Sequence, residues 1–389
     1  MENKRNILIT PFFYFLIIFS LVSFGLIIMY SASYYEALIH DLPHDYFLKR
    51  QLFFALLAFF VAIIIHFINF NIIEFFTYPL VFVSLILMLI TLFTPFGVTI
   101  LGARRWLSIP PIPSFQPSEI VKVSTILFIA KYYKNENHSD FIAIFIVLMF
   151  SSLILLQKDY STTVVYLITS FSLLLICGCE FKSLLILFCF LLTPAGLALF
   201  SQSYRVKRIL SFLYPSLDPS GLNYQINNSI EAIASGGLFG KGIGNGYYKK
   251  GILPEVQNDF IFSHLSEELG FIGILFLIVL LILFTHIGYK IAKRNYKKNN
   301  FFSYVSFGIT TSIVLQAIIN MMVVTSLLPP TGIPLPFFSQ GGTNLFFTIV
   351  LTSVVHKIIC ETEIEKDCKD DEKNSVNNLL SDYEEKYFE

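Results

Sequence analysis

The stretch LPEVQNDFIFSHLSEELGFIG (253–273) joins a glycine-rich polar loop to a run of almost unbroken apolar residues. The run predicts a helix over about 260–287, which is long enough to cross the hydrocarbon core of a bilayer. Two acids, Glu255 and Asp259, lie where the loop meets the helix. Charged groups at a membrane span are costly, and those that occur usually have a functional reason.

Similar apolar runs recur along the 389-residue chain, which is 55% hydrophobic and only 14% charged. They predict an all-α, polytopic membrane protein with ten transmembrane helices. The first run follows MENKR without a small-residue cleavage site, so we interpret it as a retained span. The formal net charge of zero gives no indication of nucleic-acid binding. The predicted spans are 10–30, 51–68, 73–95, 117–132, 141–157, 162–178, 183–200, 260–287, 302–325 and 341–359.

Basic residues near the span ends predict the orientation. The segment KIAKRNYKKNN (290–300) carries five of them, which favours the cytoplasm. With ten spans, both termini are then cytoplasmic: a short tail, 1–9, and a charged tail, 360–389, whose composition predicts disorder. The opposite face receives a large extracytoplasmic loop, 201–259, between spans seven and eight.

Charged residues gather at this outer face. Arg104 and Arg105 stand in a short outer loop, against the positive-inside rule. Glu119 and Lys122 follow Pro117, which suits the first turn of a helix, and their spacing places them on one helix face. Ionisable groups inside a span usually face a cavity or the bundle interior. The alternatives are a self-neutralising buried pair and interfacial snorkelling of the arginines.

Asp259 is predicted in the first turn of its helix, with Ser263 and Ser266 on the same face. A partner of the helix dipole is the structural alternative. The polar face and the nearby cations favour a catalytic carboxylate that accepts a proton as general base. Cations suit a pyrophosphate, and an apolar groove suits a lipid tail. The residues therefore predict an enzyme acting on a lipid-pyrophosphate-linked sugar.

Two other motifs indicate no separate chemistry. GGLFGKG (236–242) lacks the Ser or Thr that follows the lysine of a phosphate loop, and its glycines more simply allow close packing. The five cysteines, including Cys177 and Cys179, are interpreted as free thiols and small apolar side chains, since no His or second Cys pair accompanies that pair in the sequence.

Several stretches, in this order, carry a resemblance to a known family: GARRWL (102–107), QPSEIVK (116–122), SGGLFGKGIGNG (235–246), the opening stretch and LLPPTGIPLPFFSQGG (327–342). Over about 10–359 the chain resembles the SEDS proteins, the family of FtsW, RodA and SpoVE. MYSASYY (29–35) and YFLKRQ (46–51) are more similar to FtsW than to RodA.

The resemblance implies a ten-span SEDS fold and a peptidoglycan glycosyltransferase. Such an enzyme polymerises lipid II at the outer face of the bacterial cytoplasmic membrane. The FtsW likeness implies septal wall synthesis in cell division, with a class B penicillin-binding transpeptidase and other division proteins as partners. A RodA-type elongation polymerase and a lipid II flippase are the alternatives, and a membrane scaffold is a third.

The resemblance also implies site residues. Its catalytic aspartate falls on Asp259, and Glu119 would hold either Lys122 or a divalent cation, with no other cofactor expected. QKDYST (157–162) departs from the family's QPDLGT, and SQGGTN (339–344) from its SYGGSS. The residues implied to bind substrate are Arg104, Arg105, Glu119, Lys122, Lys249 and Asp159.

Overall fold

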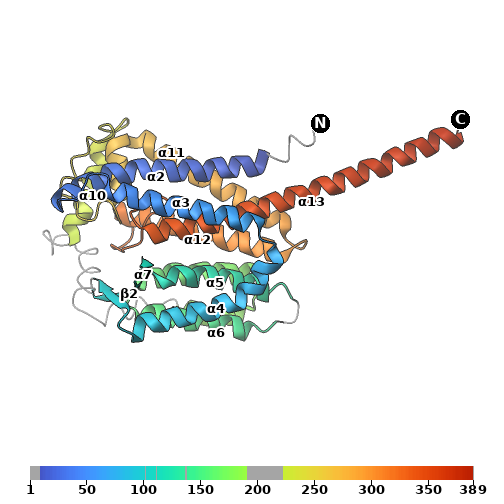
Figure 1. Cartoon of the computed structure of the whole chain (residues 1–389), viewed down its shortest axis with the longest axis horizontal. Helices are drawn as coiled ribbons and strands as arrows, with labels where there is room; N and C mark the ends of the chain where they lie inside the picture. Colours follow the sequence, from blue (N-terminus) through green and yellow to red (C-terminus); the bar gives the residue numbers. More distant parts are fainter. Residues whose placement is uncertain (1–8, 101, 111, 136–137, 191–221, 389) are drawn as a thin grey trace.

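The computed structural model describes residues 9–100, 102–110, 112–135, 138–190 and 222–388. Long helices dominate this part of the chain and run roughly along one axis (Figure 1). The helices are α2 (Ile9–Ile39), α3 (Tyr46–Phe67), α4 (Phe70–Phe93), α5 (Pro117–Tyr132), α6 (Asp140–Leu156), α7 (Tyr160–Cys177), α10 (Leu222–Gly236), α11 (Ile261–Asn295), α12 (Asn300–Val324) and α13 (Gly342–Phe388).

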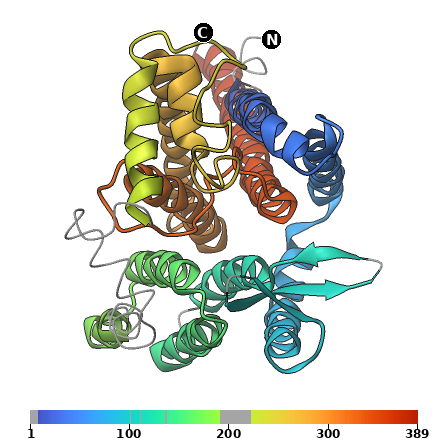
Figure 2. The ribbon, with the colours of Figure 1, turned by 90° about the vertical axis from the view of Figure 1, so that its left-hand side faces the viewer.

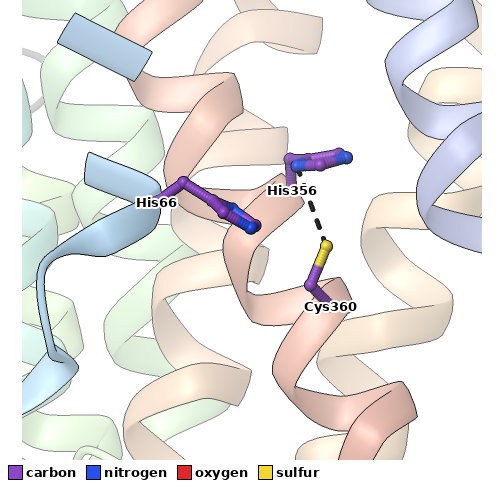
Figure 3. A group of neighbouring side chains, drawn as sticks. All are labelled: His66, His356 and Cys360. Carbon is purple, nitrogen blue, oxygen red and sulfur yellow. Dashed lines mark hydrogen bonds between the residues drawn. The ribbon is translucent and has the colours of Figure 1, made fainter. Parts of the chain in front are cut away.

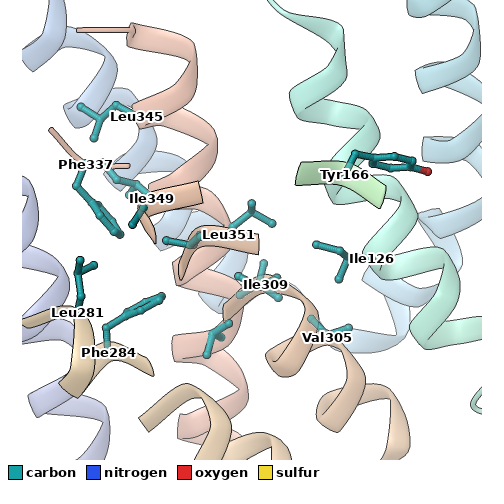
Figure 4. Close-up of a cluster of buried hydrophobic side chains, with 14 of the residues drawn as sticks. Ile126, Tyr166, Leu281, Phe284, Val305, Ile309, Phe337, Leu345, Ile349 and Leu351 are labelled. Atoms are coloured by element: carbon teal, nitrogen blue, oxygen red, sulfur yellow. The ribbon is translucent and has the colours of Figure 1, made fainter. Parts of the chain in front are cut away.

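The helices form two groups, as Figure 2 shows. One group holds α4 to α7, and the other holds α2, α3, α10, α11, α12 and α13. α12 joins them, because it packs against α5 and α7 on one side and against α11 and α13 on the other. The buried apolar core follows this junction, with Ile126 of α5, Tyr166 of α7, Phe284 of α11 and Ile309 of α12 (Figure 4).

Seven helices in the described part of the chain are long and apolar enough to cross a membrane. They match seven of the predicted spans. The predicted spans 117–132 and 141–157 are helices of 16 and 17 residues, and most of α5 is buried in the bundle. The predicted span 183–200 lies partly outside the described residues, within which Phe181–Phe190 is a short apolar helix. The count of ten spans therefore stays a prediction.

Local sequence signals set several helix ends. Pro117 begins α5, as predicted, where its missing N–H costs no hydrogen bond. The Asn69 side chain accepts a 3.0 Å hydrogen bond from the Asn71 N–H and so caps α4. Gly178 ends α7 in the left-handed conformation that favours glycine.

The all-α prediction was wrong for the segment between α4 and α5. This segment forms an antiparallel sheet of β1 (Gly97–Ile100), β2 (Ala103–Ile109) and β3 (Ile112–Phe115) in the order β1-β2-β3. Prolines at 110, 111 and 113 disfavour regular strand pairing. Pro113 instead occupies an edge strand, where a missing N–H is tolerated. Gly102, with a φ of 76°, supplies the left-handed turn between β1 and β2.

The glycine run 236–242 in the predicted outer loop packs into a break in α11. The break lies at Gly270, whose φ of 65° is left-handed. The N–H groups of Lys241 and Gly242 donate to carbonyls just before the break, at 3.0 and 2.9 Å. N–H groups just after the break donate to carbonyls of the run. This confirms that the glycines permit close backbone approach, because a Cβ at Gly240 would lie 2.2 Å from a carbonyl oxygen of α11.

The prediction of disorder for the tail 360–389 does not match the structure, in which α13 continues as a helix to Phe388. The tail is rich in Glu and Lys, which are good helix formers, and residues 360–388 contain neither Gly nor Pro. Composition alone predicted disorder because the tail has few apolar residues, but a helix does not need them when it continues from a packed one.

Candidate active site

A cavity of about 330 Å³ lies at the end of the bundle where α5, α11 and α13 begin. We call it the mouth pocket. Its walls come from the sheet, α5, α7, α12, the turn before α11 and the segment 332–344. The segments meet from both helix groups, so the pocket combines residues that are far apart in the sequence. Its polar lining consists of Arg105, Gln116, Glu119, Lys122, Thr162, Glu255, Asn258, Asp259, Gln316, Gln340, Thr343 and Asn344.

Asp259 lines the mouth pocket from the turn before α11, where it is half-buried. Its backbone carbonyl accepts a 2.9 Å hydrogen bond from the Asn320 amide of α12. Gly332 packs beside its carboxylate, since a Cβ at Gly332 would lie 3.3 Å from Oδ2. The predicted place in the first helical turn was wrong, because α11 begins at Ile261 and Phe260 is its N-cap. Tertiary contacts, more than the helix end, position this aspartate.

The hydroxyl stripe predicted beneath Asp259 is used elsewhere. Ser263 and Ser266 are fully buried and do not line the mouth pocket. Ser263 Oγ lies 2.7 Å from Ser229 Oγ of α10, and Ser266 Oγ donates to a carbonyl within its own helix. The Ser263 hydroxyl therefore packs α11 against α10, the Ser266 hydroxyl stays within α11, and this part of the predicted site was wrong.

Glu119 and Lys122 share one face of α5, as their spacing predicts, and both line the mouth pocket. Lys122 Nζ lies 2.8 Å from Glu119 Oε2 and donates to Gln316 Oε1 of α12 at 3.2 Å. The Gln316 amide in turn donates to the Pro334 carbonyl at 3.0 Å. The ammonium is buried but remains charge-balanced, and the carboxamide fixes its direction.

Arg104 and Arg105 are adjacent on β2, where the register with β1 shifts at a bulge, and their side chains make different contacts. Arg105 lines the mouth pocket. Arg104 does not, and its guanidinium instead donates to the Thr94 carbonyl at the end of α4. The structure therefore brings one of the two predicted arginines to Asp259, Glu119 and Lys122, and gives the other a contact that holds the sheet on α4.

Asp159 lies behind Arg105 and is 2% exposed. Its Oδ1 is 3.6 Å from Arg105 Nη1, and its Oδ2 accepts a 2.8 Å hydrogen bond from Gln116 Nε2. The same side chain caps α7 by accepting from the Thr162 N–H at 3.3 Å. Asp159 does not itself line the mouth pocket but contacts three residues that do. It thus orients the pocket wall between the sheet and α7.

Lys249 lies outside the mouth pocket. Its buried ammonium is 2.9 Å from Glu268 Oε1 of α11 and 2.9 Å from Ser31 Oγ of α2. The preceding acid, Glu267, binds Lys241 in the same way at 2.8 Å. Lys241 and Lys249 of the outer loop are thus paired with two fully buried acids of α11, and these contacts hold the loop on the bundle.

Several pocket residues were missed in the sequence. Gln316 lines the pocket, and Asn320 holds the Asp259 carbonyl; the two are polar residues four positions apart within a predicted apolar span, so they share a helix face. That pattern could have identified α12 as a pocket wall. Gln116 and Asn344 offered no comparable signal, because Gln116 directly precedes Pro117 and Asn344 closely follows Gly341 and Gly342.

Relatives of this chain cover nearly its whole length. It is 37% identical over 352 residues to the probable peptidoglycan glycosyltransferase FtsW of Borreliella burgdorferi, covering 89% of this chain and 95% of that protein. It is 36% identical over 351 residues to the stage V sporulation protein E of Bacillus subtilis, covering 86% and 93%.

Solved structures agree with the fold. A chain of a peptidoglycan synthase complex that coordinates polymerization and crosslinking superposes with a TM-score of 0.74 at 25% identity, covering 90% of this chain and 98% of that one. The rod shape determining protein RodA of Thermus thermophilus superposes with a TM-score of 0.65 at 24% identity, covering 89% and 95%. Residues 12–364 match the family model of FtsW, RodA and SpoVE, described as "Cell cycle protein". With a match of this extent and relatives above 30% identity, the chain belongs to the FtsW/RodA/SpoVE family.

Proposed function

We propose that this protein is a peptidoglycan glycosyltransferase that polymerises lipid II in the mouth pocket. The observation that carries the proposal is the meeting of the Asp259 carboxylate with two cationic side chains, Arg105 and Lys122, in a single cavity. Relatives named peptidoglycan glycosyltransferase support it, since they align along most of the chain.

Asp259 would act as the general base. Its carboxylate accepts the proton of the acceptor sugar's 4-hydroxyl, whose oxygen then attacks the anomeric carbon of the donor. The bond from that carbon to the pyrophosphate oxygen breaks with inversion, and the bonding pair leaves with the lipid pyrophosphate. No nucleotide is consumed, because the pyrophosphate linkage of the donor is itself the activated bond.

Negative charge grows on the pyrophosphate as that bond breaks. Arg105 and Lys122 are the cations that line the pocket and can stabilise this charge by hydrogen bonds that strengthen in the transition state. Arg104 and Lys249 are less suited, because both are engaged outside the pocket. The apolar part of the lining would contact the uncharged parts of the substrate; it includes Ile100, Trp106, Val165, Ile333 and Pro334.

A divalent cation stays a prediction. Mg²⁺ is usually held by one or two carboxylates together with substrate phosphates, and a carboxylate such as Glu119 in the pocket wall fits that pattern. When bound, the ion would neutralise pyrophosphate charge. Glu119 would then exchange its 2.8 Å contact with Lys122 for the ion. Without an ion, Glu119 keeps Lys122 in position.

We further infer a role in septal wall synthesis at the cytoplasmic membrane, with both termini in the cytoplasm and a class B penicillin-binding transpeptidase as partner. The FtsW names of several relatives favour division over elongation. The synthase complex among the structural neighbours supports a transpeptidase partner. A tagged copy should concentrate at the septum, whereas an even side-wall distribution would favour the elongation role.

The test of the activity is polymerisation of labelled lipid II by the purified full-length chain, alone and with its transpeptidase. Asp259→Asn removes the base and keeps the shape of the side chain, so product should fall by at least about 100-fold. Asp45→Asn is the matched control, since that partly exposed carboxylate pairs with Lys49 outside the pocket. Full polymerisation by the folded Asp259→Asn protein would overturn the proposal, and lipid II translocation without polymer would favour a flippase.

A further inference from the structure

A second cluster of chemically active side chains lies at the other end of the bundle. It consists of His66 in the last turn of α3 and of His356 and Cys360, one turn apart on α13 (Figure 3). Between Gly342 at the mouth pocket and Cys360, α13 rises about 27 Å. In the part of the chain that the structure describes, no other His, Cys, Asp and Glu side chains form a group of three or more close enough to share an ion.

The distances are near those of a metal site. One nitrogen from each histidine and the Cys360 sulfur all lie within 4.8 Å of one another, and Cys360 Sγ is 3.9 Å from His356 Nδ1. In a tetrahedral zinc site the corresponding N···S separation is about 3.6 Å and the N···N separation about 3.4 Å. Closing the remaining gap requires mainly a side-chain rotation of His66, which is exposed and therefore free to turn.

The backbone around the cluster is held in place by Lys357. Its buried ammonium donates to the carbonyls of Ile65 and His66 at 3.2 and 3.3 Å, and also to that of Ile68. These carbonyls lie at the end of α3, so Lys357 fastens that end to α13. The positive charge lies 3.8 Å from Glu361, which offsets its repulsion of a bound cation.

His356 is supported from α2 as well. The ring of Tyr14 stacks on it with centroids 6.4 Å apart, and Phe15 approaches it edge-on at 6.3 Å. The backbone of Pro11 is a hydrogen-bond partner of the imidazole. A histidine that donates its second ring nitrogen to a carbonyl is typical of metal sites, because that bond fixes the tautomer and the ring direction.

We propose that His66, His356 and Cys360 bind one divalent transition-metal ion, with zinc as the best fit and water in the fourth position. Two imidazoles and one thiolate are ligands that zinc prefers, and three protein ligands leave one open position. Binding forms two Zn–N bonds and one Zn–S bond and releases the Cys360 thiol proton to solvent. The ion would link α3 to α13 beside α2, away from the proposed glycosyltransferase chemistry.

The test measures metal in the full-length protein. Detergent-purified protein is stripped with a chelator, loaded with Zn²⁺, passed through a desalting column and analysed for zinc per chain. Wild-type protein should retain about one zinc per chain. His66→Ala and Cys360→Ser should each lower the zinc affinity by more than about 10-fold, because even the loss of a residue that only hydrogen-bonds to a metal ligand lowers affinity by about that factor. Loading with Co²⁺ should give a thiolate-to-cobalt absorption band that Cys360→Ser abolishes.

Matched controls are His286→Ala and Cys189→Ser, because both side chains are exposed and lie outside the cluster. Both should bind zinc like the wild type. Equal zinc in Cys360→Ser and Cys189→Ser, or no zinc retained by wild-type protein, would overturn the proposal. If His66→Ala fails to fold, two other measurements decide the question. The proposal is supported if Cys360→Ser lacks the thiolate-to-cobalt band and if zinc raises the Tm of wild-type protein but not that of Cys360→Ser.

Discussion

Gly240→Ala tests how the outer loop is seated on α11. Gly240 has a left-handed φ of 74°, and an added Cβ would lie 2.2 Å from the Glu268 carbonyl oxygen and 2.4 Å from its carbon. Ordinary contact begins at 3.4 Å, so the loop must move out by about 1.2 Å, a large step for close-packed backbone. The movement would break the hydrogen bonds of Lys241 and Gly242 to the broken end of α11.

Gly244→Ala is the matched control, because Gly244 has a φ of 88° and nothing within 4 Å of an added Cβ. Both substitutions carry the left-handed cost of about 1–2 kcal/mol. Only Gly240→Ala also loses two hydrogen bonds, each worth about 0.5–1.5 kcal/mol. The excess destabilisation of Gly240→Ala is therefore about 1–3 kcal/mol.

The measurement is thermal unfolding of both variants in the same detergent at the same scan rate. At about 2 °C per kcal/mol, the scale of large domains, the Tm of Gly240→Ala should lie about 2–6 °C below that of Gly244→Ala. Equal Tm values for the two variants would refute the reasoning, because the loop would then not be seated on the break at Gly270.

The remaining predictions concern the mouth pocket and use the polymerisation assay with Tm as a check on folding. Arg105→Gln should lower kcat by about 10²- to 10³-fold, because Arg105 lines the mouth pocket, whereas Arg104→Gln should mainly lower Tm. Equal kcat losses would contradict the separate roles of the two arginines. Asp159→Asn should reduce activity less than Arg105→Gln, since the variant loses the charge that orients Arg105 but keeps a hydrogen-bonding amide. A greater loss than that of Arg105→Gln would indicate that Asp159 contacts the substrate directly. Gly332→Ala should displace the Asp259 carboxylate by a few tenths of an ångström, because the added Cβ would lie 3.3 Å from Oδ2. It should reduce kcat with little change in Tm, and an unchanged kcat would mean that the exact position of the carboxylate is not critical.

Much of the mouth pocket was predictable from the sequence. Asp259, Glu119 and Lys122 stand out because an ionisable group next to a long apolar run needs a reason to be there. The two arginines were predicted as a pair, and only the tertiary contacts around the bulge in β2 separate them into one pocket residue and one structural residue. That strand was not predicted, because nearby prolines masked its short β pattern.

Other features depend on contacts that spacing does not reveal. His66 and Cys360 meet although nearly the whole chain separates them, and nothing in their local sequence marks either as a ligand. Lys249 was assigned by resemblance, and its buried partner Glu268 lies on another element. The span count depends on α5 and α6, whose 16 and 17 residues are short for a membrane span, and on the predicted span 183–200, which lies partly outside the described residues.

The break at Gly270 also affects how the protein can respond to the bilayer. α11 has 35 residues and would measure about 52 Å as one rod, far more than the hydrocarbon core of about 30 Å. The break leaves about 37 Å after Gly270, a length that a tilted helix can fit into the membrane. The short part before it is bonded to the loop, so a thicker or thinner membrane can change the tilt of the long part without changing the position of Asp259. The protein could then keep its catalytic geometry in membranes of different lipid composition.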